Sequence, residues 1–338
     1  MMLWTALCGI ATADGPTSAE PAPAPRSAGD LWTSAPTELG DEVLVDRAAL
    51  GPTFYEQTPL DGFVSPHEPP MEEYAELATP YPTDNCQPRW RMLPDGLIYR
   101  NYLAGAKESR IRGVYSYEKD RGYLWDVSLG GKVSILRYGT GGEQRPEGFE
   151  IQLEGAGLLR LDPEANMDVE ATDYRIGAPL VWGNRVYQMK FGYYHLSSHL
   201  GDEFLLRHPN YDRLNYSRDV IVWGHSYYAT RRLRFYAEAG WAFASEIAKP
   251  WEFQFGIDYS PYFATGTRGA PFFAFNGQLR EEVDFGGAFV AQAGWAWRGS
   301  PASGLLRFGV DYYNGKSDQF SFYDHHENKV GMAVWYDY

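Results

Sequence analysis

Long apolar runs are missing from this sequence of 338 residues. Nowhere do about 18 consecutive apolar residues occur, the length that a membrane-spanning helix requires. The mean hydropathy of −0.43 agrees with that exclusion. Basic residues are also scarce, since 30 Lys and Arg stand against 44 Asp and Glu and leave a net charge of −14. Because phosphate binding draws on clustered Lys and Arg, nucleic acid is not an expected partner.

Cysteine is nearly absent, with Cys8 and Cys86 as its two occurrences. Cys8 lies in residues 1–13, where an apolar run ends in Ala11-Thr12-Ala13. This A-x-A pattern is typical of a signal-peptidase site, so we expect 1–13 to be a signal-like segment and the chain to be exported. One remaining cysteine cannot form an internal disulfide framework. Tyr, Trp and Gly are abundant instead (25, 11 and 36 residues), and this composition suits a large β protein.

Residues 14–96 differ from the rest and hold most of the 22 prolines. A stretch so rich in Pro, Ala and Ser cannot bury a core and is typical of an extended linker. We therefore expect a Pro-rich, disordered periplasmic arm over 14–96. The alternative is a segment that plugs the following domain or docks on a partner, and it is less favoured because charge and Pro dominate the composition.

From about residue 97 the pattern changes to alternation. In Trp251–Tyr259 the odd-numbered side chains are apolar, and the even-numbered ones are polar or Gly. A period of two is the signature of strands with two different faces. The pattern predicts twelve strands: 113–118, 122–138, 148–162, 168–180, 185–197, 216–230, 233–247, 251–261, 271–281, 286–299, 303–314 and 329–338.

Two architectures can hold such strands. A soluble sandwich or barrel turns the apolar face inward, whereas an outer-membrane barrel turns it toward lipid. Aromatic side chains near strand ends and polar faces of mixed charge favour the second. The last ten residues also resemble the C-terminal signal by which outer-membrane barrels are recognised for assembly, here Lys329, Gly331, Val334 and Tyr336. We predict an all-β fold, a transmembrane antiparallel β-barrel of twelve strands over 97–338, in the bacterial outer membrane.

An even strand number predicts that both ends of the barrel chain lie in the periplasm. The long connections 198–215 and 315–328 then face outward, and the short connections 181–184, 231–232 and 300–302 face inward, which is the usual asymmetry of such barrels. Outer-membrane lipids and the barrel assembly machinery are the expected partners, and a homodimer is left open.

The lumen of a twelve-strand barrel is narrow. We therefore expect the charged residues of the polar faces to fill it rather than to line a pore: Glu150, Glu154, Arg160, Lys190, Arg234, Glu238, Asp258, Arg280, Arg298, Arg307 and Asp311.

The densest polar constellation lies on and after the predicted strand 185–197. His195 and Ser197 extend its lipid-facing side at the outer end, where polar side chains are costly unless they lie at the interface or have a task. The inert alternative is a hydrogen-bonded patch that orders the long loop. A metal site is a further alternative, with N and O ligands from His199, Asp202 and Glu203, provided that the chain turns sharply from residue 198 onward.

The His-x-Ser pair at the outer end of a mid-barrel strand resembles a short motif of outer-membrane phospholipase A, a twelve-stranded barrel with His, Ser and Asn on its lipid-facing surface. The resemblance implies Ser197 as nucleophile, His195 as general base and Asn215 as the residue that orients the imidazole. The sequence departs from that family at Ser198, where the family has Asn, and in a longer Ser-to-Asn spacing. Asp202 or Asp219 could equally be the third member.

More broadly, residues 93–338, with Leu97-Ile98-Tyr99-Arg100 and His195–Glu203, resemble an uncharacterised family of bacterial exported proteins, a domain of unknown function. That resemblance implies the barrel and no activity. The leading expectation is therefore an outer-membrane barrel with a structural or small-solute role. The alternative is a lipid acyl hydrolase of the phospholipase A type, assisted by calcium or another metal.

Overall fold

The computed structural model describes residues 87–141, 145–299 and 302–338. The signal-like segment 1–13, both cysteines and all of the predicted arm before residue 87 lie outside these ranges. In the described ranges, no helix is long and apolar enough to cross a membrane.

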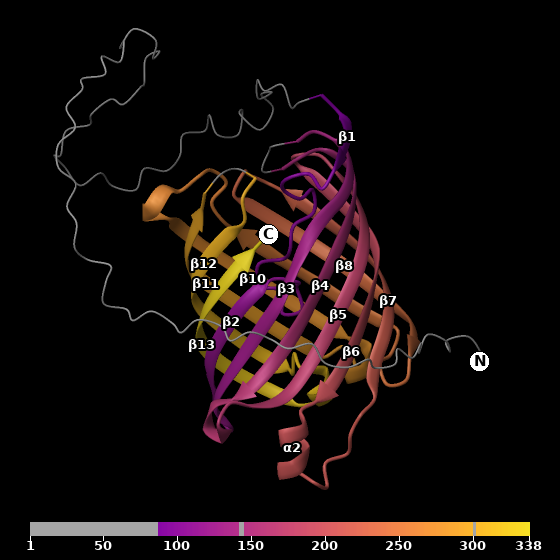
Figure 1. Ribbon diagram of the computed structural model, residues 1–338, viewed down its shortest axis with the longest axis vertical. Coiled ribbons are helices and arrows are strands. Elements are labelled where there is room, and N and C mark those ends of the chain that lie inside the picture. Colours follow the sequence, from indigo (N-terminus) through magenta and orange to yellow (C-terminus); the bar gives the residue numbers. More distant parts are fainter. Residues whose placement is uncertain (1–86, 142–144, 300–301) are drawn as a thin grey trace, which may run out of the picture. The chain divides into compact units, whose positions relative to one another are not determined.

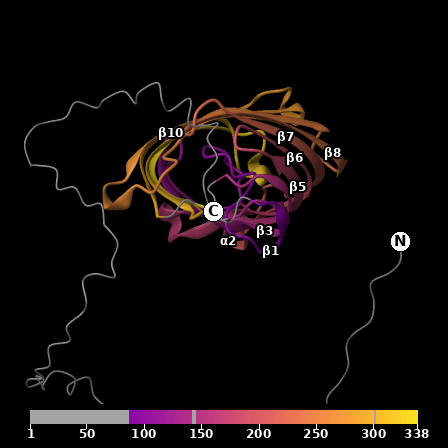
Figure 2. The ribbon, with the colours of Figure 1, turned by 90° about the horizontal axis from the view of Figure 1, so that it is seen from above.

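A closed barrel of twelve antiparallel strands forms the wall, because the last strand pairs with the first (Figures 1 and 2). Each strand pairs with its neighbours in chain order, so the connections are hairpins throughout. The strands are β2 (Ile111–Glu118), β3 (Gly122–Gly139), β4 (Gly148–Asp162), β5 (Asp168–Gly183), β6 (Tyr187–Leu200), β7 (Tyr216–Tyr228), β8 (Leu233–Ser245), β9 (Trp251–Tyr259), β10 (Ala270–Arg280), β11 (Gly287–Arg298), β12 (Leu305–Lys316) and β13 (His326–Asp337). All twelve predicted strands are confirmed, with ends displaced by a few residues.

The two faces of the wall follow the alternation of the sequence. Along β13, the side chains of Val330, Met332 and Val334 are exposed on the outside, whereas Lys329 and Trp335 are buried in the lumen. Large exposed hydrophobic side chains occur on every strand of the barrel. An apolar exterior around a polar interior is the arrangement of a transmembrane β-barrel. The protein is therefore an outer-membrane β-barrel.

Short elements mark the two ends of the barrel. At one end lies the connection 201–215, which carries α2 (Asp202–Arg207), together with the turns η3 (Pro163–Ala165), η5 (Glu281–Val283) and η6 (Phe320–Phe322). We call it the α2 end. The opposite end carries β1 (Arg89–Met92) and η4 (Gly266–Arg268), and we call it the β1 end (Figure 1). The predicted outward connections lie at the α2 end and the predicted inward ones at the β1 end.

The strand β1 lies outside the closed ring of twelve. It pairs with residues 136–139 of β3, on the same edge that pairs farther along with β2. Between β1 and β2 the chain leaves the wall and runs through the lumen, where Ile98, Tyr99 and Tyr102 are fully buried (Figure 2). We call residues 94–110 the lumen segment. The strand pattern before residue 113 held no sign of it.

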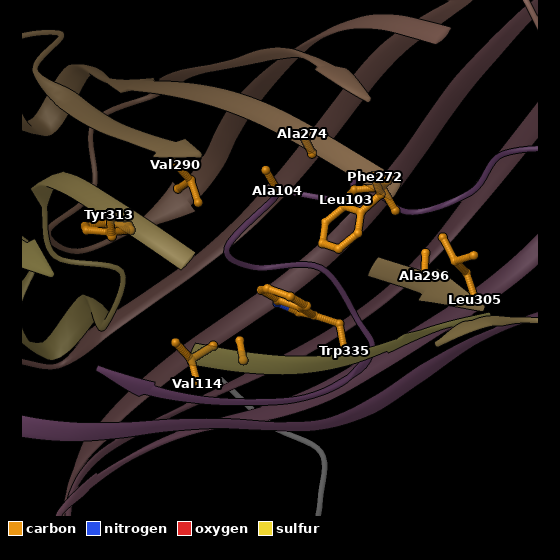
Figure 3. Close-up of a cluster of buried hydrophobic side chains, with 11 residues drawn as sticks. Leu103, Ala104, Val114, Phe272, Ala274, Val290, Ala296, Leu305, Tyr313 and Trp335 are labelled. Carbon is orange, nitrogen blue, oxygen red and sulfur yellow. The ribbon is translucent and has the colours of Figure 1, made fainter. Parts of the chain in front are cut away.

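Apolar packing and guanidinium groups hold the lumen segment in place. Leu103 and Ala104 pack in a buried cluster with Phe272 and Trp335 (Figure 3). The carbonyl oxygen of Leu103 accepts hydrogen bonds from Arg110 Nη1 at 2.7 Å and from Arg307 Nη2 at 3.1 Å. These carbonyls of an irregular backbone would otherwise be buried without partners, which is costly. Arg307 of the wall and Arg110 of the segment itself therefore serve as donors for the segment that the barrel encloses.

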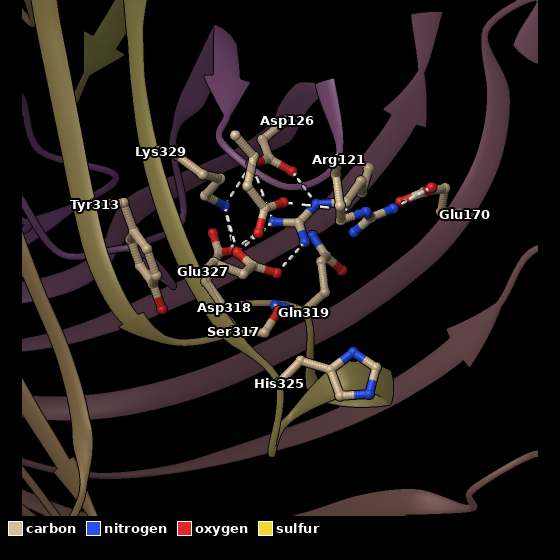
Figure 4. A network of polar contacts seen from close by, with 12 residues as sticks. Arg121, Asp126, Glu170, Tyr313, Ser317, Asp318, Gln319, His325, Glu327 and Lys329 are labelled. Carbon is tan, nitrogen blue, oxygen red and sulfur yellow. Dashed lines mark hydrogen bonds and ion pairs between the residues drawn. The ribbon is translucent and has the colours of Figure 1, made fainter. Parts of the chain in front are cut away.

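At the α2 end the connection 317–325 also folds into the lumen. Its Asp318 lies in a network in which Arg160 bonds Asp126 and Asp318, each at 2.7 Å, and also contacts Glu327 (Figure 4). Lys329 completes the network, with its Nζ 3.0 Å from Asp126, 3.1 Å from Asp318 and 2.7 Å from Glu327. Two cations thus face three carboxylates in a buried and closely bonded cluster.

Candidate functional site

The candidate site is a polar patch on the outer face of the barrel wall. His195 and Ser197 both point outward from β6, near the point where this strand ends at Leu200 and α2 follows. The His195 side chain keeps 36% of its surface exposed. The prediction that this pair lies on the lipid-facing side, close to the outer end of the strand, is therefore confirmed.

Pairing between β6 and β7 supplies the third member of the patch. Asp219 lies directly opposite His195 in the register, and its Oδ1 is 2.8 Å from His195 Nδ1. Tyr193, one strand repeat before His195, donates its hydroxyl to the same Oδ1 at 2.6 Å. An ionised carboxylate only accepts hydrogen bonds, so this contact requires that Nδ1 carries a proton. In the neutral imidazole Nε2 is then the acceptor.

Ser197 lies two residues after His195 on the same face of β6, a separation of about 6.7 Å along a strand. In the described part of the chain, no hydrogen bond joins its hydroxyl to His195. Ser217 of β7 is directly opposite Ser197 in the register. The patch therefore holds two hydroxyls beside one imidazole, and Ser217 is the natural comparison for any role of Ser197.

The structure does not place Asn215 beside His195. Asn215 precedes β7, and its Nδ2 donates to Glu246 at 2.8 Å instead of contacting His195. The register places Asp219 opposite His195, and four strand residues span about 13 Å. Of the alternatives that the sequence left open, Asp219 makes the contact, and Asp202 lies on α2, beyond the end of β6.

The expected metal ligands are not brought together either. β6 continues as a strand through Leu200, so the sharp turn that His199 would need does not occur. His199 points outward beside Tyr174, with the ring centroids 6.0 Å apart, whereas Asp202 and Glu203 are exposed in the first turn of α2. Over 87–141, 145–299 and 302–338, no three His, Cys, Asp or Glu side chains form a group that could hold a metal ion.

Charged side chains and main chain occupy much of the described lumen. The charged residues predicted to fill it are buried, or nearly so, and most are ion-paired across strands, as in Lys132 with Glu154 at 3.0 Å and Arg307 with Asp337 at 2.7 Å. The lumen segment and the connection 317–325 add buried residues to this interior. Sequence patterns predicted the charged side chains but missed both of these segments.

Tyr193 was also missed as part of the site. In the sequence it is one aromatic residue among many on a lipid-facing stripe. Its polar role appears only through Asp219, which the register of β7 brings beside it. A signal that could have found it is the coincidence of Tyr, His and Ser at alternate positions of a single strand.

The chain belongs to the family described as "Protein of unknown function (DUF1207)", whose model matches residues 53–338. No curated protein matches the sequence. Among solved structures, it is similar to the outer membrane phospholipase A from Escherichia coli, with 12% identity, 68% of this chain and 90% of that chain covered, and a TM-score of 0.44. The Salmonella typhi outer membrane phospholipase dimer with bound calcium has 11% identity, the same coverage and a TM-score of 0.45. The KdgM porin in complex with disordered oligogalacturonate has 11% identity, covers 68% and 99%, and scores 0.39. Matches this distant carry no argument about activity.

Proposed function

We propose that this member of the DUF1207 family hydrolyses ester bonds of lipids at the outer surface of the barrel. Ser197 is the nucleophile, His195 is the general base, and Asp219 positions the imidazole. The observation that carries the proposal is the 2.8 Å contact between His195 Nδ1 and Asp219 Oδ1 on the lipid-facing wall, one strand repeat from a serine.

The tautomer that this contact requires suits acyl transfer. With the proton on Nδ1 donated to Asp219, Nε2 can accept the proton of Ser197 Oγ as the oxygen attacks the ester carbonyl. The imidazolium then returns the proton to the oxygen of the leaving lysolipid. Water attacks the acyl-serine in the second half of the cycle, with His195 again as base. The Oγ-to-Nε2 contact must form when substrate binds, since catalytic hydrogen bonds are often long without substrate.

The position of the patch along the strands is compatible with a function at the membrane surface. A lipid-facing Lys or Arg costs about 2–4 kcal/mol at the bilayer midplane and about 0–1 kcal/mol near the interfaces, with Asp less costly. His195 and Asp219 lie toward the α2 end of their strands, where the cost is low and an ester of the outer leaflet is within reach. Lumen-facing charged side chains help to pack the interior of the barrel. The outward pair of His195 and Asp219 has no such packing role.

A small-solute channel receives less support, because the described lumen is filled by the lumen segment and by the connection 317–325. A structural role without chemistry remains the outcome if the patch is inert. Outer-membrane lipids are partners of the proposed reaction, whereas the assembly machinery and the homodimer stay predictions. Calcium assistance stays a prediction, and no step of the proposed reaction is assigned to calcium.

The test is fatty-acid release from phospholipid micelles by the refolded full chain, with and without calcium. We expect Ser197→Ala to lower the rate by at least about 10³-fold, since removing a nucleophile leaves only binding and electrostatic contributions. Ser217→Ala is the matched control, because it removes the opposite hydroxyl on the same face. Heat-modifiable migration on gels verifies that each variant is folded.

Three outcomes separate the alternatives. Loss of activity in Ser197→Ala alone supports the proposed nucleophile. Loss in Ser217→Ala alone would transfer that role to the neighbouring strand. No release by a folded wild-type barrel, with calcium present or absent, would refute the hydrolase and leave the patch structural.

A further inference from the structure

A small cavity in the lumen at the β1 end has an excess of positive charge. Its volume is about 50 Å³, and among the described residues of its lining six are arginines and two have carboxylate side chains, Asp258 and Asp337, beside Tyr338, the last residue of the sequence. The six are Arg100, Arg145, Arg231, Arg232, Arg234 and Arg298. They come from the lumen segment, from the wall and from the connections at this end, so that sequence-distant residues converge on one cavity.

Both carboxylates are already engaged by other groups. Asp258 accepts a hydrogen bond from the backbone N–H of Leu103 at 3.2 Å and lies 3.4 Å from Arg234 Nη1. Asp337 lies 2.7 Å from Arg110 and 2.7 Å from Arg307, neither of which lines the cavity. The negative charge at the lining is therefore largely used in holding the lumen segment to the wall.

Three of the arginines lack a carboxylate among their contacts in the described residues. Arg298 bonds the carbonyl oxygens of Pro261 at 3.1 Å and Ser303 at 2.9 Å, and Arg145 bonds that of Arg185 at 3.0 Å. In Arg100, two of the guanidinium nitrogens, Nε and Nη2, are buried without any hydrogen-bond partner. A buried guanidinium donor without an acceptor is costly, so these two nitrogens lack the acceptor that a bound ligand could supply.

The surroundings of Arg145 fix its orientation and keep it charged. Its guanidinium lies 3.7 Å from the ring centroid of Tyr228 and 5.0 Å from that of Tyr262. Burial lowers the pKa of Arg145 to about 10, and the charges of Arg100 and Arg234 act in the same direction. The group stays protonated at neutral pH, and an anion in the cavity would relieve the repulsion between these guanidinium groups.

We propose that this cavity is a binding site for a phosphate group, held by Arg100, Arg145 and Arg298. A phosphate carries a charge of about −1.5 to −2 and three or more acceptor oxygens, which matches three cations that lack a carboxylate partner. A carboxylate brings a single charge and two acceptor oxygens, and would leave donors unpaired. The cavity has room for about three or four waters or for one oxyanion of similar size.

The position of the cavity favours a water-soluble source. It lies among lumen-facing side chains and the connections of the β1 end, so the ligand enters from the aqueous phase rather than from the lipid-facing wall. The site accepts free phosphate or the terminal group of a small phosphomonoester. It lies toward the opposite end of the barrel from His195, and the proposal does not depend on the lipid hydrolase.

The experiment titrates inorganic phosphate into the refolded full chain in a phosphate-free detergent solution at constant ionic strength and follows the heat. We expect saturable one-site binding to the wild type and at least tenfold weaker binding to Arg100→Gln. Arg268→Gln is the matched control, since Arg268 is exposed at the same end and does not line the cavity. Glycerol phosphate and vesicles containing phosphatidylglycerol distinguish a soluble phosphate from a lipid headgroup.

A second measurement uses the wild type alone, in case Arg100→Gln does not fold. A dicarbonyl reagent specific for arginine is applied with and without phosphate, and the modified residues are mapped by mass spectrometry. We expect phosphate to protect Arg100 and to leave Arg268 unprotected. Absence of binding, equal affinity in folded Arg100→Gln, absence of protection at Arg100, or preference for acetate or succinate over phosphate would each overturn the proposal.

Discussion

The two faces of the same barrel wall treat polar side chains in opposite ways. On the lumen face, arginines and lysines are paired across strands or bonded to carbonyls of the lumen segment, as in Arg160 with Asp126 and Arg307 with Leu103. On the lipid face, a hydrogen bond between His195 and Asp219 joins the exposed sides of neighbouring strands. Polar groups inside follow from the need to fill a narrow barrel, whereas the pair outside has no such cause and is the basis of the proposed hydrolase.

The two ends of the lumen differ in a similar way. At the α2 end, Arg160 and Lys329 face three carboxylates, and every partner is supplied by the chain. At the β1 end, arginines outnumber carboxylates around the cavity, and Arg100 has unpartnered nitrogens. The first cluster needs no ligand, and it ties the connection 317–325 to the strands of the wall. The second has the composition of a site that an anion completes.

Removing Asp219, which positions the imidazole, tests the lipid face. In Asp219→Ala the imidazole loses its hydrogen-bond acceptor, and we expect fatty-acid release to fall by on the order of 10⁴-fold. Asp219→Asn keeps an acceptor oxygen opposite His195 and should recover part of the rate. Release is compared at saturating lipid. Equal rates for wild type and Asp219→Ala would show that the contact between His195 and Asp219 has no role in catalysis.

Removing Arg160 tests the lumen face at the α2 end. Arg160→Met leaves Asp126, Asp318 and Glu327 with fewer buried partners, and breaking a buried ion pair of this kind costs about 3–5 kcal/mol. We expect a lower urea midpoint in lipid vesicles, read from the loss of heat-modifiable migration. Arg268→Met, which alters an exposed arginine outside the network, is the control. An unchanged urea midpoint in Arg160→Met would contradict a stabilising role of this network.

The filled lumen predicts a silent barrel in planar bilayers. Arg234 donates to the carbonyl oxygens of Arg100 at 3.0 Å and Asn101 at 2.9 Å, so Arg234→Ser should loosen the lumen segment and allow brief openings. The wild type is recorded beside it at the same voltages. Steady single-channel conductance of the wild type would show that the lumen segment does not block the path and would restore the channel interpretation.

The smallest effect is expected at His225, another histidine of the lipid face. His225 of β7 contacts the hydroxyl of Tyr187 and packs against Trp223, but it has no neighbouring Ser or Asp in this arrangement. We expect His225→Gln to change fatty-acid release by less than about twofold, whereas His195→Gln should abolish it. A comparable loss in both variants would mean that lipid-facing histidines affect the fold or the lipid contact rather than the reaction.

Much of this architecture could be predicted because its cause is local. Alternation in segments such as Trp251–Tyr259 depends only on the two-residue repeat of a strand. Each of the twelve strands and its lipid-facing side could therefore be predicted from its own segment of sequence. The site was readable in part. His195 and Ser197 share one strand, and their common face follows from the same repeat.

The remaining features depend on contacts that no local pattern contains. The sequence by itself determined the strands, their two faces and the outward position of His195 and Ser197. The tertiary structure alone decided that Asp219 rather than Asn215 reaches His195. Strands β6 and β7 are joined by the long connection 201–215, and the alternation within each strand does not show which of their residues lie opposite each other. The tertiary structure also decided that residues 94–110 turn into the lumen, because only a closed barrel creates the interior that their buried side chains and carbonyls require.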